Sequence, residues 1–315
     1  MHPVTGQEYL TLGLSALEQV FHFAKEKKED YIVHLGDVFH LKDRIPVRVW
    51  NEFMKVLGKW DSEGLHSFWL MGNHDVDKDI AIKSFSISNR AHPIYSPAVH
   101  TLNNFRCLFL PYNINPEVIT QYEDIEIVFM HDYFRGVSYF REGITAREGF
   151  PLSRLKNIPR TFSGHAHMFQ EIVRGRVWHI GSPYQTSFNE VGQKKYFAHL
   201  TPAFLEFHEF KFPEFVQVDM GKSGELVDVK DSYVKLVYEF GTVTDEEVQK
   251  ERDRLLEYGA RIVKIEARKI AGVSKQRITL APSAQKRDFI KEYVDLKGKE
   301  FDKKLLCEVG EGFTK

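Results

Sequence analysis

The sequence predicts an α/β (α+β) protein in which two β-sheets pack face to face and are flanked by helices. Helical and strand-like patterns alternate over residues 7–71, which is typical of a layered α/β sheet. From about residue 94 to residue 210 the pattern becomes rich in strands. Short polar clusters directly follow several apolar runs, as expected where strands of such a sheet end.

The alternation begins with an amphipathic helix that we predict over residues 7–27, where apolar side chains recur at helical spacing. The apolar run 31–35 then predicts a buried strand. Pro46 is well placed to begin the next helix, over residues 47–60. A second strand follows at 66–71, which completes one layered unit.

The second part of the chain should supply most of the strands. They are expected at 98–102, 105–110, 125–130, 160–163, 169–173 and 176–180, with further strands between 195 and 210. A helix near 115–122 interrupts this series.

A boundary is expected near residues 220–231, where Gly221-Lys222-Ser223-Gly224 breaks the apolar pattern. Beyond it, a strand, a charged helix and another strand are predicted at 233–240, 244–258 and 261–267. We therefore predict a main domain over 1–220, a small α/β domain over 221–283 and a tail over 284–315.

Composition limits the class of protein. The chain is 43% hydrophobic and 28% charged, as in ordinary globular proteins, and it contains no run of ~18 apolar residues. Residues 1–6 lack the basic and apolar regions of a signal peptide, so we expect none. Cys107 and Cys307 are the only cysteines, so we expect a cytoplasmic protein (host cytoplasm if the source is a virus) with no membrane partner. The net charge of -1 argues against a passive nucleic-acid binder, but not against an enzyme whose metal ions supply positive charge.

Four polar clusters follow predicted strands. They are Gly36-Asp37-Val38-Phe39-His40, Gly72-Asn73-His74-Asp75, Met130-His131-Asp132 and Gly164-His165-Ala166-His167. Any one of them could be a turn, a helix cap or a structural histidine. Four in this order supply the oxygen and imidazole ligands of a centre that cleaves phosphoesters with two metal ions.

The individual residue types suit different tasks. A carboxylate such as Asp37 can bridge two cations, and the side-chain oxygen of Asn73 is a neutral ligand. His165 and His167 lie one residue apart, on the same side of an extended segment, and can reach neighbouring metals. His74 can either protonate a leaving oxygen or stabilise developing charge.

These motifs resemble the ordered motifs of the calcineurin-like metallophosphoesterases, D-x-H, G-D-x-x-[DH], G-N-H-[DE], H and G-H-x-H. Within that family the chain looks most like the SbcD-type nuclease subunit of the double-strand-break repair complex, especially the short bacteriophage versions. The resemblance covers residues 7 to about 270 and includes Gly181-Ser182-Pro183-Tyr184-Gln185, which resembles a segment that these nucleases carry after G-H-x-H.

The resemblance implies a metallophosphoesterase sandwich that hydrolyses DNA phosphodiesters with two Mn²⁺ ions, or with Mg²⁺, as a 3′-to-5′ exonuclease and single-strand endonuclease. It implies that Asp37 bridges the metals, that Asn73, His131 and His165 complete one site, and that His167 serves the other. By the same resemblance, His74 is the transition-state acid or stabiliser.

The resemblance also implies partners. The 221–283 domain would cap DNA, and the tail would dock on the coiled-coil base of an SbcC-type ATPase, although an amphipathic tail could equally pack on its own domain. Family members commonly form homodimers.

One family motif is not found. D-x-H should fall at or just before Met1, so one metal would keep only Asp37 and His167, and a strand of the main domain would be missing. We expect a misassigned start codon, a truncated record or a split gene rather than an evolved single-metal enzyme.

Contacts to DNA are expected from loops after the site strands. The candidates are Lys42, Arg44, Tyr133, Arg135 and Tyr139, which could hold the backbone or stack on bases, or could simply be solvated. Two alternatives to a nuclease stay open: another metallophosphoesterase, such as a phosphatase or cyclic-nucleotide phosphodiesterase, and a catalytically impaired scaffold that binds DNA and the ATPase.

Overall fold

The structure is a computed structural model of the chain, and the residues that it describes are 6–41, 44–77, 80–81, 89–138, 145–220 and 228–268. The chain divides into two units, residues 1–267 and 268–315, and all of the second unit except Arg268 lies outside the described residues. The tail predicted over 284–315 therefore lies outside them too. The boundary predicted between residues 220 and 221 stays a prediction.

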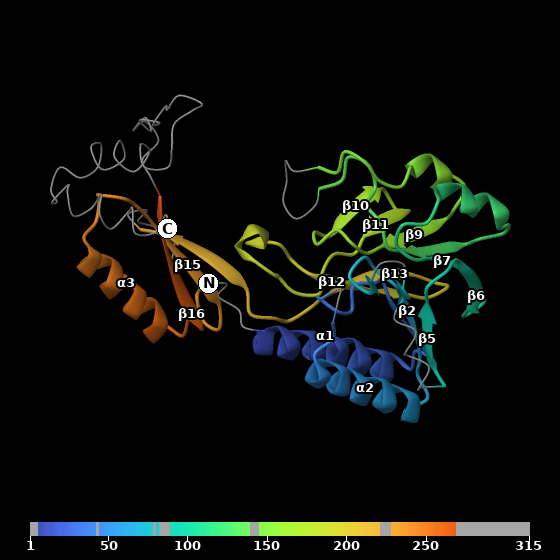
Figure 1. Cartoon of the computed structure of the whole chain (residues 1–315), viewed down its shortest axis with the longest axis horizontal. Coiled ribbons are helices and arrows are strands. Elements are labelled where there is room, and N and C mark those ends of the chain that lie inside the picture. The colour runs from blue at the N-terminus through green and yellow to red at the C-terminus, as the bar shows by residue number, and fades with distance from the viewer. Residues whose placement is uncertain are drawn as a thin grey trace, which may run out of the picture. The chain divides into compact units, whose positions relative to one another are not determined.

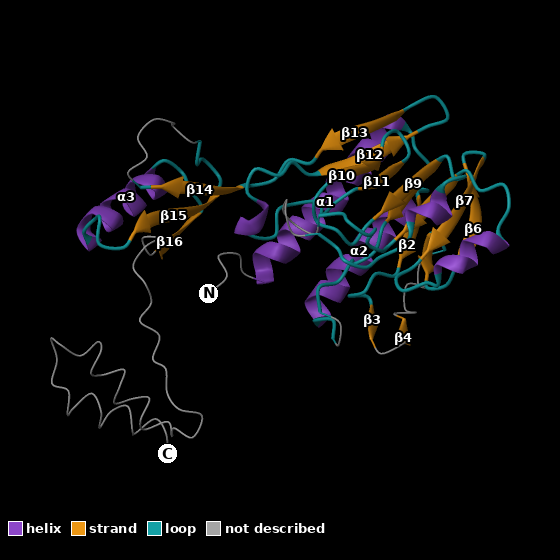
Figure 2. Ribbon diagram, turned by 90° about the horizontal axis from the view of Figure 1, so that it is seen from above, coloured by secondary structure: helices purple, strands orange, loops and turns teal. Residues whose placement is uncertain are grey.

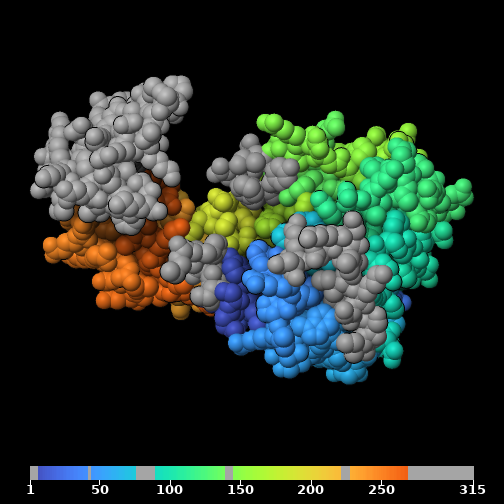
Figure 3. All heavy atoms as spheres, in the orientation of Figure 1, coloured from blue at the N-terminus to red at the C-terminus, as the bar shows by residue number. Residues whose placement is uncertain are grey.

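Two helices cover one face of a three-stranded parallel sheet (Figure 1). The helices are α1 (Gly6–Lys27) and α2 (Val47–Ser62), and the strands are β1 (Tyr31–His34), β2 (His66–Leu70) and β5 (Ala91–Ile94), in the order β1-β2-β5. These elements confirm the helices predicted at 7–27 and 47–60 and the strands predicted at 31–35 and 66–71. In the space-filling view α1 and α2, in blue, form part of the outer surface (Figure 3).

Aromatic packing holds this first layer together. Trp69 of β2 is fully buried, and its ring stacks on Trp60 of α2 at 5.6 Å and meets Phe53 edge-on at 5.1 Å. Phe21 of α1 stacks on the far side of Trp60 at 6.1 Å. Ring pairs of this kind stabilise a core beyond the area that they bury.

The second sheet has six strands and packs on the first. Its order is β10 (Gln170–Val173), β11 (Val177–His179), β9 (Arg160–Ser163), β8 (Ile127–Met130), β7 (Phe105–Leu110) and β6 (Ala98–Leu102). Successive side chains of a strand point to opposite faces, so Phe109 packs on Phe68 of the first sheet while Leu108 and Leu110 face away. Both faces of β7 and β8 are buried, which explains their nearly continuous apolar sequences. The predicted two-sheet sandwich flanked by helices is thus confirmed.

The outer face of this sheet is covered by loops and two 3₁₀ helices, η1 (Pro116–Gln121) and η2 (Leu152–Leu155). The helix predicted near 115–122 is therefore a 3₁₀ helix; the Asn115 side chain caps it by accepting a bond of 3.0 Å from the N–H of Glu117. A hairpin of β12 (Tyr196–Leu200) and β13 (Leu205–Glu209) packs beside the sandwich. Two short strands, β3 (Val76–Asp77) and β4 (Ile80–Ala81), pair after β2.

Another sheet, also of three strands, follows later in the sequence and has one helix packed on it (Figure 2). It contains β14 (Phe215–Asp219), β15 (Tyr233–Glu239) and β16 (Ile262–Arg268), and the helix is α3 (Asp245–Glu257). Thr244 and Glu247 form a reciprocal capping box at the start of α3. β14 was not predicted; it lies before residue 221 yet pairs in parallel with β15. Within the described part of the chain, no helix is long and apolar enough to cross a bilayer.

Candidate metal centre

The candidate site lies where four strands end. β1 and β2 are parallel neighbours in the first sheet, and β8 and β9 are parallel neighbours in the second. Each of them is followed by one of the four polar clusters. The packing of the two sheets brings these loops together, so that Asp37, His131 and His165 each place a possible ligand atom within 4.8 Å of the other two.

His131 is the centre of the group. Its Nδ1 donates to the carbonyl oxygen of Leu35 at 2.5 Å, which leaves Nε2 to face the rest of the site. That Nε2 lies 3.3 Å from Asp37 Oδ2, 3.1 Å from His165 Nδ1 and 3.2 Å from Asn73 Oδ1. Burial alone would lower the pKa of His131, but the hydrogen bond and charge of Asp37 raise it. Four atoms that can each bind a cation therefore face one another.

Such an arrangement needs positive charge among the four atoms, supplied either by a proton on His131 Nε2 or by a metal ion. The spacings of 3.1–3.3 Å around His131 are close to the roughly 3.0–3.4 Å expected between neighbouring ligands that bind one ion at about 2.1 Å. The Asn73 amide suits a metal ligand as it stands, with its oxygen toward the group; turned over, its nitrogen would instead donate to His165 Nδ1 at 2.7 Å. The donor set thus fits a divalent metal ion.

The ionisation states also suit a metal. Burial alone would raise the pKa of Asp37, but the hydrogen bond and charge of His131 lower this pKa to about 2. Burial lowers the pKa of His165 to about 3, and the charge of His131 acts in the same direction. Asp37 is therefore ionised and His165 is neutral near neutral pH, which are the forms that bind metals.

Asp75 fixes the two loops that carry Asp37 and Asn73. Its fully buried carboxylate accepts four backbone hydrogen bonds, from the N–H groups of Asp37 (2.7 Å), Val38 (3.3 Å), Phe39 (3.1 Å) and Gly72 (3.0 Å). Burial raises the pKa of Asp75 despite these bonds. The sequence motif contains Asp75, but the sequence did not predict this role.

The backbone at the site is unusual. Asp37 and His165 both have left-handed conformations, with φ of 58° and 75°, and Gly36 precedes Asp37 with φ of 98°. For residues other than glycine this region costs roughly 1–2 kcal/mol, and strain of this kind clusters at functional sites. Gly72 leaves room for the group, because a Cβ there would collide with Asp37 Oδ1 and lie 2.8 Å from His131 Cε1.

His74 lies beside the group without joining it. Its backbone N–H donates to Asp37 Oδ1 at 2.8 Å, and its ring Nδ1 lies 2.7 Å from the carbonyl oxygen of His40, to which it donates. The rings of His40 and His74 stack with their centroids 5.7 Å apart. This arrangement fixes the ring of His74 and leaves Nε2 to exchange a proton.

His167 lies outside the compact group and has its own support. Its Nδ1 lies 3.0 Å from Oε1 of Glu190, a residue of η3 (Phe188–Glu190) that is 1% exposed. A donor bond from Nδ1 leaves Nε2 of His167 available as a ligand. Its assignment to a second metal stays a prediction.

Glu190 is part of a buried ionic network that the sequence did not predict. Lys195 Nζ lies 2.7 Å from Glu190 Oε2, and it also donates to the His167 carbonyl (2.8 Å) and to Ser182 Oγ (3.0 Å). Ser182 belongs to Gly181-Ser182-Pro183-Tyr184-Gln185, so this network holds that segment against the His167 loop. Burial would raise the pKa of Glu190, but the bond from His167 and the charge of Lys195 lower it to about 2.

The residues proposed to contact DNA differ in their surroundings. Lys42 and Tyr139 lie outside the described residues. Arg44 and Arg135 are exposed, whereas the ring of Tyr133 lies 3.9 Å from the ring of His165. The ring of Tyr112, which the sequence interpretation missed, lies 5.5 Å from the His165 ring, and Tyr112 is 38% exposed. Its position directly after the β7 strand, in Pro111-Tyr112, was the available signal.

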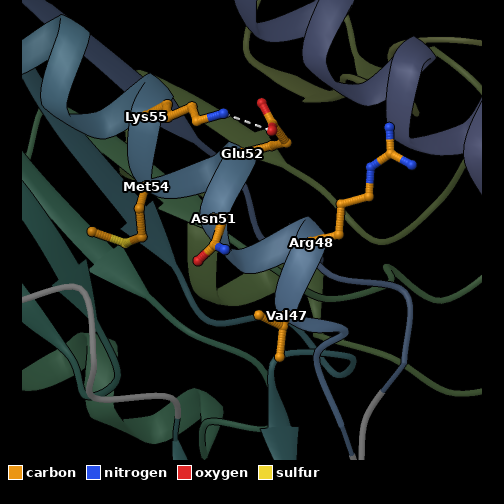
Figure 4. Close-up of a pocket in the computed structure, with 6 residues that line it drawn as sticks. All are labelled: Val47, Arg48, Asn51, Glu52, Met54 and Lys55. Carbon is orange, nitrogen blue, oxygen red and sulfur yellow. Dashed lines mark hydrogen bonds and ion pairs between the residues drawn. The ribbon is translucent and has the colours of Figure 1, made fainter.

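A hollow of about 650 Å³ opens along α2 (Figure 4). Its described lining consists of Val47, Arg48, Asn51, Glu52, Met54 and Lys55. Glu52 and Lys55 form an ion pair of 2.8 Å there. None of the candidate metal ligands lines this hollow.

Comparison with known families agrees with the site. Residues 12–199 match the family described as Calcineurin-like phosphoesterase. The chain belongs to this family. It is accordingly a metal-dependent phosphoester hydrolase in general terms, and the matched residues include every candidate ligand. None of the curated proteins compared with the chain matches it.

Replacing Gly72 by Ala should disable the centre, because the added Cβ meets Asp37 and His131. Displacing reacting groups by about 1 Å can lower turnover on the order of 100-fold. We expect weaker Mn²⁺ binding by calorimetry and at least that loss in hydrolysis of bis(p-nitrophenyl) phosphate. Gly58→Ala in α2 is the control, since a Cβ there meets nothing within 4 Å; unchanged hydrolysis in G72A would contradict the prediction.

Glu190→Gln should destabilise the protein in a pH-dependent way, because it leaves Lys195 buried without a counter-charge. The loss should be about 3–5 kcal/mol near neutral pH. The pKa of Glu190 is lowered from 4.5 to about 2 on folding, so its contribution is present above about pH 4.5 and disappears as the pH falls toward 2. Denaturant unfolding of both proteins from pH 7 to pH 3 measures this difference.

The control for that experiment is Glu52→Gln, which removes a solvent-exposed ion pair with Lys55. Its effect should stay within about 1 kcal/mol. A difference between wild type and E190Q that grows on acidification would refute the assignment.

Proposed function

We propose that the chain is a Mn²⁺-dependent DNA nuclease, a 3′-to-5′ exonuclease and single-strand endonuclease that acts as the SbcD-like subunit of a cytoplasmic repair complex. The observation that carries the hydrolytic part is the convergence of Asp37, Asn73, His131 and His165 ligand atoms around one point. The motif order and the Gly181–Gln185 segment support the nuclease rather than another phosphoesterase.

In this proposal Asp37, Asn73, His131 and His165 hold one metal ion, and His167, with Asp37, holds the other. When bound, such ions neutralise the phosphate and lower the pKa of water. Asp75 and Gly72 keep the ligands in place, and Glu190 orients the His167 ring through Nδ1. The contribution of this chain is thus to position the ligands.

His74 performs the proton transfer in this scheme. Its ring is fixed through Nδ1 by the His40 carbonyl, so Nε2 can donate to the departing oxygen of the cleaved ester. Its backbone N–H holds Asp37, which ties the position of the acid to the metal ligand.

We predict that His74→Ala retains bound Mn²⁺ but loses turnover by 10²- to 10⁴-fold, the usual contribution of a general acid. The measurement is kcat for DNA cleavage at saturating Mn²⁺, together with the metal content. His22→Ala is the control, because it removes an exposed histidine of α1 that does not belong to the site. Substantial cleavage by H74A would remove His74 from this role.

The rings of Tyr112 and Tyr133 next to His165 support a nucleic-acid substrate, because both rings could stack on bases beside the scissile phosphate. Loss of one stacked base weakens binding by about 1–3 kcal/mol. Tyr112→Ala should therefore reduce cleavage of DNA about 5- to 100-fold while hydrolysis of bis(p-nitrophenyl) phosphate changes little. Equal losses on both substrates would favour a small-molecule phosphodiesterase.

The proposed partners are DNA, an SbcC-type ATPase and a second copy of the chain. The exposed Arg44 and Arg135 support DNA contacts, and the three-stranded sheet with α3 would cap the DNA. A scaffold that binds DNA without cleaving it is the alternative. It is favoured because, among the described residues, the loops of the candidate metal centre bring together one compact ligand group, Asp37, His131 and His165, rather than two. Cleavage of DNA at saturating Mn²⁺ separates these functions, because a scaffold would bind the DNA and leave it intact.

A further inference from the structure

A second group of metal-binding side chains lies at the β12–β13 hairpin. His199, Glu206 and His208 each place one possible ligand atom within 4.8 Å of the other two. None of them belongs to the catalytic group. The register pairs His199 with Glu206 across the hairpin and places His208 on the same face, two residues along β13.

The end of α1 supplies a second carboxylate. Lys28 has a left-handed backbone with φ of 60°, and the N–H of Glu29 bonds back to the Ala24 carbonyl at 2.8 Å. This helix ending fixes Glu29, and its Oε1 lies 2.8 Å from His199 Nε2. Glu29, in the segment that follows α1, thus fixes the ring of His199 in β12.

An ion pair between Glu29 and His199 does not explain His208. The Nε2 atom of His208 is buried and makes no hydrogen bond, although Glu206 Oε2 lies 3.5 Å away. A buried imidazole nitrogen without a partner is unfavourable in a protein interior. A cation between the two histidines and Glu206 would satisfy it.

The surroundings are those of an ordered site. The Phe23 ring of α1 packs edge-on against His199 at 5.1 Å and lies 4.4 Å from the His208 ring, so both imidazoles are held. Side-chain exposure rises from 8% for His199 to 57% for Glu206. The group is therefore closed on the protein side and open to an entering ion on the other.

We propose that His199, Glu206 and His208 form a structural site for Zn²⁺ or a similar transition-metal ion, with Glu29 holding the ring of His199. Zn²⁺ prefers four ligands of this kind, imidazole nitrogen and carboxylate oxygen, at about 2.0–2.2 Å. Ligand atoms bound at that length in a tetrahedron lie roughly 3.3 Å apart. The one separation known within the group, 3.5 Å between Glu206 Oε2 and His208 Nε2, is close to this value, and all three ligand atoms lie within 4.8 Å of one another. The ion joins the two strands of the hairpin.

The test counts metal on the full-length chain. Wild type, His208→Gln and the double variant His199→Gln/His208→Gln are equilibrated with Zn²⁺, dialysed and analysed by mass spectrometry. Each variant should hold one Zn²⁺ fewer per chain than wild type. Phosphodiester hydrolysis should stay unchanged in H208Q, because the catalytic group is intact.

His22→Gln is the matched control. It removes a histidine of α1 whose Nε2 lies 3.3 Å from Glu18 Oε2, a comparable pair with no second histidine. Its Zn²⁺ content should equal that of wild type. Equal Zn²⁺ in H208Q and wild type overturns the proposal.

A second measurement is independent of the catalytic metals. In a His131→Ala/His165→Ala background, Co²⁺ should still produce a d–d absorption band and raise the melting temperature, and adding His208→Gln should abolish both. If the double variant His199→Gln/His208→Gln fails to fold, this H208Q comparison decides. A spectrum that His208→Gln leaves unaltered refutes the site.

Discussion

The Asp75 carboxylate is the interaction on which the candidate site depends. It accepts N–H groups from the loop after β1 and from the loop after β2, so it fixes the two loops relative to each other. Without it, four backbone donors would lose their partner in a buried place, and each unsatisfied donor costs about 1–3 kcal/mol. The positions of Asp37 and Asn73 follow from this one side chain, because they lie on the two loops that it joins.

The ligand group itself is an arrangement that the polypeptide alone does not favour. Ligand atoms converge on one point, and two of the residues concerned have left-handed backbones. Rigid surroundings hold this arrangement: the sheets behind, Asp75 at the loop ends and the Leu35 carbonyl at His131. The site is thus formed in advance, and the binding energy of a cation need not be spent on ordering the loops.

The sequence predicted much of this protein because the strands are buried on both faces. The apolar runs at β7 and β8, and the polar clusters that end β1, β2, β8 and β9, are local signals. Other features depend on tertiary contacts. β5 is a short edge strand that contains Pro93, and proline is tolerated at an edge but weakens the strand pattern. The helix near 115–122 has the right place but only six residues in a 3₁₀ conformation.

At the site, too, some residues carry a local sequence signal and others depend on tertiary contacts. The candidate ligands follow strands directly, so their spacing was informative. Glu190 and Lys195 come from a later segment, and nothing local indicates that they meet His167. Asp75 is part of the sequence motif Gly72-Asn73-His74-Asp75, but its four hydrogen bonds depend on how the loops fold around it.

The network around Glu190 also ties the site to the later part of the chain. From His167 the contacts run through Glu190 and Lys195 to Gln193, whose carbonyl accepts from Gln185. Gln185 in turn accepts the N–H of Phe215, the first residue of β14, at 2.6 Å. A continuous series of hydrogen bonds through five side chains therefore joins the His167 ring to the first strand of the three-stranded sheet. A change in the position of that sheet would reach a candidate metal ligand through these bonds alone.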